Sequence, residues 1–237
     1  RDALSQGIYT LAPNYAFYNG NTAEDVFTIQ NSAIDNGRTG SGGWAAYYNP
    51  AAVGGRGDAP FSQDLIDAYS AEAGDKRFDL KAAGVATDGL SHFFTTKFPD
   101  AVNNSDNAPV MRTTELYLNL AEALAQQSTT VADAKAVEAI QILNVRLRDR
   151  AGLGPKVVAD KNALIAAILV ERRKELAFEG ERYLDMQRLQ RNIARSKNYP
   201  AAALSIDFTN YRRIMPIPQG ELDANPSIKS QQNPGWN

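Results

Sequence analysis

The side chains best suited to bind a small molecule gather in one glycine-rich stretch of the chain. They are Trp44, Tyr47, Tyr48 and Asn49, with Arg38 and Arg56 in the flanking loops. Sugars present flat patches of C–H groups that stack on aromatic rings, while amide and guanidinium groups hydrogen-bond to the hydroxyls around each patch. The stretch therefore has the composition of a carbohydrate-binding platform. The alternative is that its aromatic rings fill the core, and the residues alone favour neither interpretation.

The residue types that most enzymes use for catalysis are scarce. The chain has no cysteine, and His92 is its only histidine, so thiolate nucleophiles and histidine-ligated metal clusters are excluded. No Gly-x-Ser-x-Gly turn accompanies a candidate serine, and neither glycine-rich loop ends as a phosphate-binding loop does. A glycoside hydrolase needs only two carboxylates at the correct separation, and no spacing here argues for such a pair. We expect no catalytic residue, metal or cofactor.

Residues 171–182 place charges where an amphipathic helix should be apolar. One helix face is formed by residues at three- and four-residue steps, and these are Ile165, Leu169, Leu176 and Tyr183. Arg172 and Glu179 fall on the same line, so we expect buried ions that Glu175, Glu179 and Arg182 compensate. The alternatives are a solvated helix with ion pairs along its surface and, less favoured, catalytic carboxylates, because a helix interior offers a substrate no access.

Composition limits the class of protein further. The chain has 237 residues, 43% of them hydrophobic, which is enough for a substantial core in one large domain or two small ones. Its 25 basic and 27 acidic residues give a formal charge of −2, so it has no basic field that would attract nucleic acid. No apolar run approaches the roughly 18 residues of a membrane-spanning helix.

The elements that must position these residues differ before and after residue 110. Residues 1–110 are rich in aromatic residues and glycine, and we predict an irregular region with candidate ligand-binding loops at 37–50 and 53–60. Within it we expect a strand at 24–30, a helix from Ser62 to about 73, and a second strand near Phe93 and Phe94.

Residues 111–237 are predicted to form a helical region with an extended tail, packed with the first part as one unit. Hydrophobic periodicity predicts helices from Thr113, over 131–150, and over 161–191 with Gly180 at a crossing, kink or break. The first two have the spacing of a tetratricopeptide-like hairpin. The proline-rich tail beyond residue 200 should be irregular and wrap the surface, held by Ile214, Ile217 and Leu222.

Several motifs in the second part resemble the SusD/RagB family of outer-membrane nutrient-binding lipoproteins. They are RTTELYLNLAEA at 112–123, LNVRLRDRAGL at 143–153, YLDMQR at 183–188 and MPIPQ at 215–219. Weaker similarities occur at residues 24–30, 42–44 and 75–78. The resemblance implies a mainly α, SusD-like fold of helical hairpins with an irregular loop-rich part and few short strands.

The same resemblance implies non-catalytic binding of oligosaccharide or another nutrient at the cell surface, and its delivery to a SusC-like TonB-dependent transporter. Family members are longer, with a signal peptide, an acylated cysteine and several helix pairs ahead of this region, so we expect the chain to be a C-terminal part whose lipid anchor lies outside it. Two alternatives stay open: a helical protein-interaction module without sugar binding, and a glycan-active hydrolase.

Overall fold

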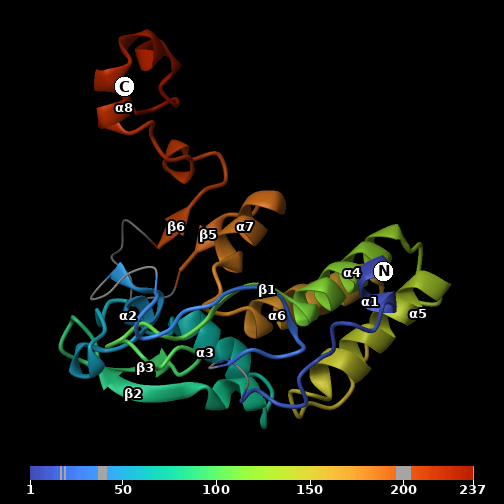
Figure 1. Ribbon diagram of the computed structural model, residues 1–237. Coiled ribbons are helices and arrows are strands. Elements are labelled where there is room, and N and C mark those ends of the chain that lie inside the picture. The colour runs from blue at the N-terminus through green and yellow to red at the C-terminus, as the bar shows by residue number, and fades with distance from the viewer. Residues whose placement is uncertain (17, 19, 37–41, 196–203, 237) are drawn as a thin grey trace. The chain divides into compact units, whose positions relative to one another are not determined.

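A computed structural model describes residues 1–16, 18, 20–36, 42–195 and 204–236 (Figure 1). It contains two compact units, unit 1 over Arg1–Glu181 and unit 2 over Arg182–Asn237. The fold is mainly α, as predicted. The α-helices are α1 Asp2–Ser5, α2 Trp44–Tyr48, α3 Gln63–Ser70, α4 Thr113–Gln127, α5 Ala134–Gln141, α6 Lys161–Glu175, α7 Glu181–Arg188 and α8 Gln219–Ala224.

Helices α4, α5 and α6 pack side by side around the main hydrophobic core of unit 1 (Figure 1). Its fully buried side chains include Leu118 of α4 and Leu164 and Ile168 of α6. Asp133 and Asp160 cap α5 and α6 by accepting hydrogen bonds from backbone N–H groups of the first turn. The predicted helix over 131–150 is α5 followed by a π-helix over Ile142–Arg148, a wider winding that the hydrophobic period does not encode.

The predicted helix over 161–191 is interrupted. Helix α6 ends at Glu175, and Phe178 and Gly180 have φ angles of 67° and 90°, which lie in the left-handed region. The buried ammonium of Lys97 donates to the carbonyls of Glu175 and Ala177, at 2.9 Å each, and so satisfies acceptors that a continuous helix would have used. Gly180 therefore marks a break.

The strands form small antiparallel pairs. In unit 1, β1 Asp25–Ile29 pairs with β4 Ala108–Arg112, and β2 Lys81–Val85 pairs with β3 Ser91–Thr95. The predicted strands at 24–30 and around Phe93 correspond to β1 and β3. Strands β2 and β4 were missed, because the first is mostly alanine, glycine and lysine and the second contains Pro109.

Unit 2 contains α7, the pair of β5 Ile193–Ala194 with β6 Ser205–Ile206, and α8. Short 3-10 helices also occur at Tyr211–Arg213 and Pro226–Gln231, so the region predicted as an irregular tail contains short regular segments joined by irregular ones. Leu222 is buried, as a residue that holds the tail by hydrophobic packing would be. Ile214 is 55% exposed, so its side chain does not hold the tail in this way. The indole N–H of Trp236 donates instead to the Ile214 carbonyl at 2.8 Å. No helix in the described ranges combines the length and apolarity needed to cross a bilayer.

Candidate functional site

Helix α2 carries most of the predicted binding residues, and neighbouring loops hold it in place. The N–H of Ala46 donates to the Asn104 side chain at 3.2 Å. The Asn49 amide donates to the carbonyls of Ala45 and Phe98, at 2.8 and 2.6 Å, and so uses both of its N–H groups. Asn49 is buried, so the structure places this predicted ligand-binding residue inside the loop that it braces.

Trp44 and Tyr48 lie in a cluster of aromatic rings. The Trp44 ring meets Tyr48 and Phe98 edge to face, with centroids 5.5 and 5.6 Å apart, and Tyr48 meets Phe178 at 5.4 Å. Both side chains are half-buried. The Trp44 indole N–H is buried and has no hydrogen-bond partner among the described residues. Burial, followed by the negative charge of Glu179, raises the pKa of the Tyr48 hydroxyl.

Tyr47 projects from the same helix to the surface, where it is 44% exposed. The Arg56 guanidinium lies over its ring, 4.4 Å from the centroid, in a cation–π contact. Arg56 also donates to Asp58 Oδ2 through Nε at 3.0 Å and Nη2 at 2.6 Å. The backbone N–H of Arg56 donates to the Ala46 carbonyl at 2.8 Å, which joins the loop to α2.

The structure therefore brings Tyr47 and Arg56 together on the surface, with Trp44 and Tyr48 half-buried behind them. Arg38 lies outside the described residues. Asp58 was missed as a site residue, although its position two residues after Arg56 in a glycine-rich turn was a usable signal. The predicted loops at 37–50 and 53–60 also contain more regular structure than expected, namely α2 and a 3-10 helix at Ala51–Val53.

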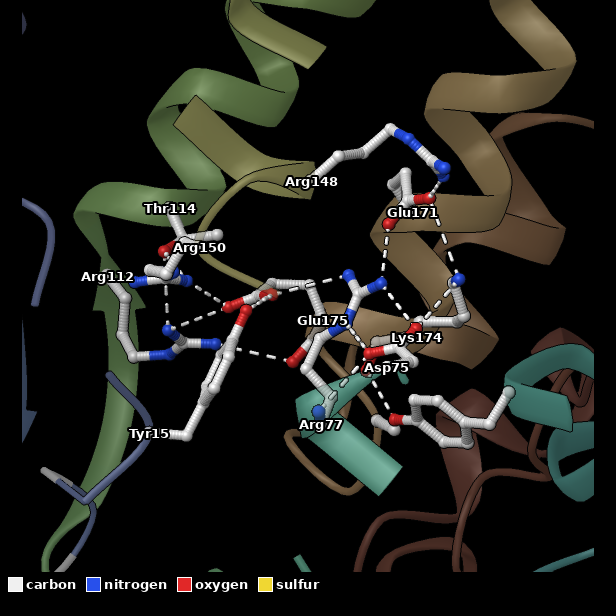
Figure 2. Close-up of polar contacts among 12 residues, drawn as sticks. Tyr15, Asp75, Arg77, Arg112, Thr114, Arg148, Arg150, Glu171, Lys174 and Glu175 are labelled. Carbon is white, nitrogen blue, oxygen red and sulfur yellow. Dashed lines mark hydrogen bonds and ion pairs between the residues drawn. The ribbon is translucent and has the colours of Figure 1, made fainter. Parts of the chain in front are cut away.

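A second group of polar side chains lies inside unit 1, among α4, α6 and the loops before β1 and β2 (Figure 2). Each of these side chains is 5% exposed or less. We call them the buried ion network, and its members are Glu24, Asp75, Arg77, Lys97, Arg112, Arg148, Arg150, Glu171, Lys174, Glu175 and Glu179.

Bidentate and shared contacts satisfy the charges of this network. Arg112 bridges Glu24 at 2.5 Å and Glu179 at 2.7 Å. Glu175 forms an ion pair with Arg150 and accepts a hydrogen bond from the Tyr15 hydroxyl at 3.1 Å. Burial alone would raise the pKa of Glu175, but nearby arginines, Arg150 first, outweigh burial and lower the pKa to about 2. The carboxylate is thus held ionised in the interior, which is typical of a structural ion network.

Arg172 is also buried, at 4% exposure, which confirms that residues 171–182 place charges inside the protein. Its guanidinium pairs with Asn119 at 2.9 Å and Glu181 at 3.0 Å. The predicted partners Glu175 and Glu179 were wrong, because both carboxylates pair with cations from other segments. Neither the solvated helix nor an accessible catalytic carboxylate fits this arrangement.

Comparison with known proteins places the chain in a family. The chain belongs to the SusD family, whose family model matches residues 72–236. No curated protein sequence matches it significantly.

Solved structures with the same fold include proteins from Bacteroides species. A SusD superfamily protein from Bacteroides vulgatus is 25% identical with a TM-score of 0.80, over 100% of this chain and 53% of that one. A second, from Bacteroides thetaiotaomicron, is 26% identical with a TM-score of 0.75, over 96% and 53%. Surface glycan-binding protein A from Bacteroides uniformis is 22% identical with a TM-score of 0.64, over 98% and 54%. The chain thus spans about half the length of these proteins.

Proposed function

We propose that this chain binds carbohydrate without catalysis, and that its ligand lies against α2 and the loop that carries Arg56. The observation that carries the proposal is the exposed Tyr47 ring beside a guanidinium and a carboxylate on one surface. An aromatic face binds the C–H patch of a sugar, and the charged groups hydrogen-bond to its hydroxyls. Membership of the SusD family supports this proposal, as does the shared fold with a surface glycan-binding protein.

The candidate residues have different roles in this proposal. Tyr47 and Arg56 contact the ligand directly. Trp44 and Tyr48 form the half-buried base of the platform and contribute the part of each side chain that remains exposed. Asn49 fixes the loop, because its amide is used by backbone carbonyls. Arg38 stays a predicted contact from the adjoining loop.

We also propose that the protein acts at the cell surface, where an N-terminal lipid anchor outside this sequence holds it at the outer membrane. The bound oligosaccharide, or another nutrient, then passes to a SusC-like TonB-dependent transporter. The helical hairpins of unit 1 form the surface that meets the transporter. Co-purification of the transporter with this protein, and its loss when surface residues of α5 are changed, would test this arrangement.

A glycan array followed by calorimetric titration of the best ligand tests carbohydrate binding. Tyr47→Ala should weaken binding about fivefold, because stacking on one ring contributes on the order of 1 kcal/mol. Phe27→Ala is the matched control: Phe27 is a similarly exposed aromatic residue, 59% accessible, on β1. Its removal should leave the affinity unchanged.

Three results would contradict the proposal. Equal affinities of Tyr47→Ala and the unaltered protein would exclude this surface as the site. Shortened products, seen by chromatography after incubation with polysaccharides, would show turnover and favour the hydrolase alternative. An array without any hit would favour a protein-interaction module instead.

A further inference from the structure

The Arg56–Asp58 pair, which lies beside Tyr47, has hydrogen-bond donors and acceptors that the described protein groups do not use. Both side-chain hydrogen bonds from Arg56 to Asp58 end on Oδ2, at 2.6 and 3.0 Å, and Oδ1 accepts none from the described residues. Arg56 also contacts the Tyr47 side chain. The guanidinium has five N–H donors, and these two bonds leave others directed away from the carboxylate. The two side chains are 35% and 38% exposed, so the remaining donors and acceptors are open to a ligand.

We infer that the Tyr47–Arg56–Asp58 surface selects neutral, hydroxyl-rich glycans and disfavours those that carry carboxylate or sulfate groups. This inference rests on the proposed carbohydrate-binding function. A sugar hydroxyl both donates and accepts, so a neighbouring pair of hydroxyls can donate to Asp58 Oδ1 and accept from Arg56 at the same time. A carboxylate or sulfate only accepts, and it would have to approach Asp58 against charge repulsion.

Neither α2 nor the described loop over residues 97–106 offers an anion a free cation. Helix α2 carries no ionisable group besides tyrosine, and the loop that contacts it through Asn104 contributes Asp100 and Asp106. Lys97, at the start of that loop, is buried against Glu179 and is not available to a ligand. The guanidinium itself is already neutralised by Asp58. A polyanionic glycan would therefore lose solvation without gaining a free cation.

The Asp58→Asn variant tests the inference, because it releases the Arg56 charge and keeps a side chain of the same size. Binding would be measured by calorimetry to a neutral polysaccharide, to polygalacturonate and to chondroitin sulfate, at low and at physiological salt. The unaltered protein should bind the neutral polymer at least about tenfold more tightly than either anion. Asp58→Asn should gain at least about tenfold in affinity for the anions, and added salt should reduce that gain.

Asp2→Asn makes the same change of charge on α1, which lies far from α2 within unit 1 (Figure 1), and should leave all affinities unchanged. Arg38→Ala shows whether Arg38, which lies outside the described residues, contributes to the affinity for anionic polymers. The inference is overturned if the unaltered protein binds an anionic polymer as tightly as the neutral one, or if Asp58→Asn gains no affinity for anions; carbohydrate binding would still stand in either case. Failure to bind any polymer overturns the proposed function as well.

Discussion

At the scale of single residues, the surface and the interior of this protein use arginine in opposite ways. Arg56 is partly exposed and pairs with one aspartate, so its remaining donors can serve a ligand. Arg172 is 4% exposed and is surrounded by protein acceptors. The same side chain is thus a recognition group in one place and a structural one in the other, and only its surroundings decide which.

Arg172→Met should lower the free energy of unfolding by about 2 kcal/mol, because it removes a buried guanidinium that pairs with the partly exposed carboxylate of Glu181 and donates to the Asn119 side chain. Urea denaturation measures the change. Arg173→Met is the matched control: Arg173 is the next residue of α6 and makes no ion pair in the described structure, so its replacement should cost less than about 0.5 kcal/mol. Equal effects of the two substitutions would show that the Arg172 charge contributes nothing specific.

The burial of Arg172 could be predicted from sequence, whereas its partners could not. Burial follows from the three- and four-residue spacing of its own helix. Asn119 comes from α4, more than fifty positions earlier, and no local pattern indicates that the two helices meet at that point. For the same reason Tyr47 and Arg56 were named as candidates, but their stacking and the part that Asp58 plays depend on how two loops fold together.

At the scale of elements, the break between α6 and α7 shows a helix ended by a distant residue. Hydrophobic periodicity continues through residues 161–191 and predicts one helix. Lys97 supplies the interaction that ends α6, and it lies on the loop after β3. Gly180 could be recognised in the sequence as a possible break. The Lys97 ammonium, which donates to the carbonyls at the end of α6, could not be predicted to lie there.

Gly180→Ala should destabilise unit 1 by about 1 kcal/mol, because an alanine at φ 90° is strained even though no atom lies within 4 Å of the added Cβ. Gly154 provides the control, since it has equal space around it and no positive φ. Gly154→Ala should leave stability unchanged or raise it by about 0.5 kcal/mol. Thermal unfolding followed by circular dichroism compares them, and a neutral Gly180→Ala would show that the break tolerates another conformation.

At the scale of the whole molecule, family and fold class were predictable because the motifs contain the residues of the buried ion network. The 112–123 and 143–153 motifs supply Arg112, Arg148 and Arg150. A charged pattern inside hydrophobic helices is unusual enough to be recognised without any structure. Two of their acidic partners, Glu24 and Glu72, lie in irregular segments, where sequence patterns carry little information.

The network also predicts how stability depends on pH. The pKa of Glu175 is about 2 in the folded protein and ordinarily 4.5, so its ion pairs stabilise the fold fully above about pH 4.5 and lose this contribution as pH falls towards 2. We expect a loss on the order of 3 kcal/mol from this group alone. Urea denaturation from pH 7 to pH 2 measures it, and unchanged stability at pH 3 would contradict the ionised state assigned to this carboxylate.

The charge balance of the network has a consequence for where a folding unit can begin. Glu72, at its edge, completes six acidic groups opposite six basic ones, and they come from segments spread between residues 24 and 179. The family match starts only at residue 72, yet Glu24 pairs with both Arg112 and Arg150. A truncated chain that starts at the family boundary would take Glu24 away from two buried guanidinium groups and leave them to share Glu175 and Glu179. We therefore expect the unit that folds cooperatively to reach further towards the N-terminus than the unit that sequence similarity recognises.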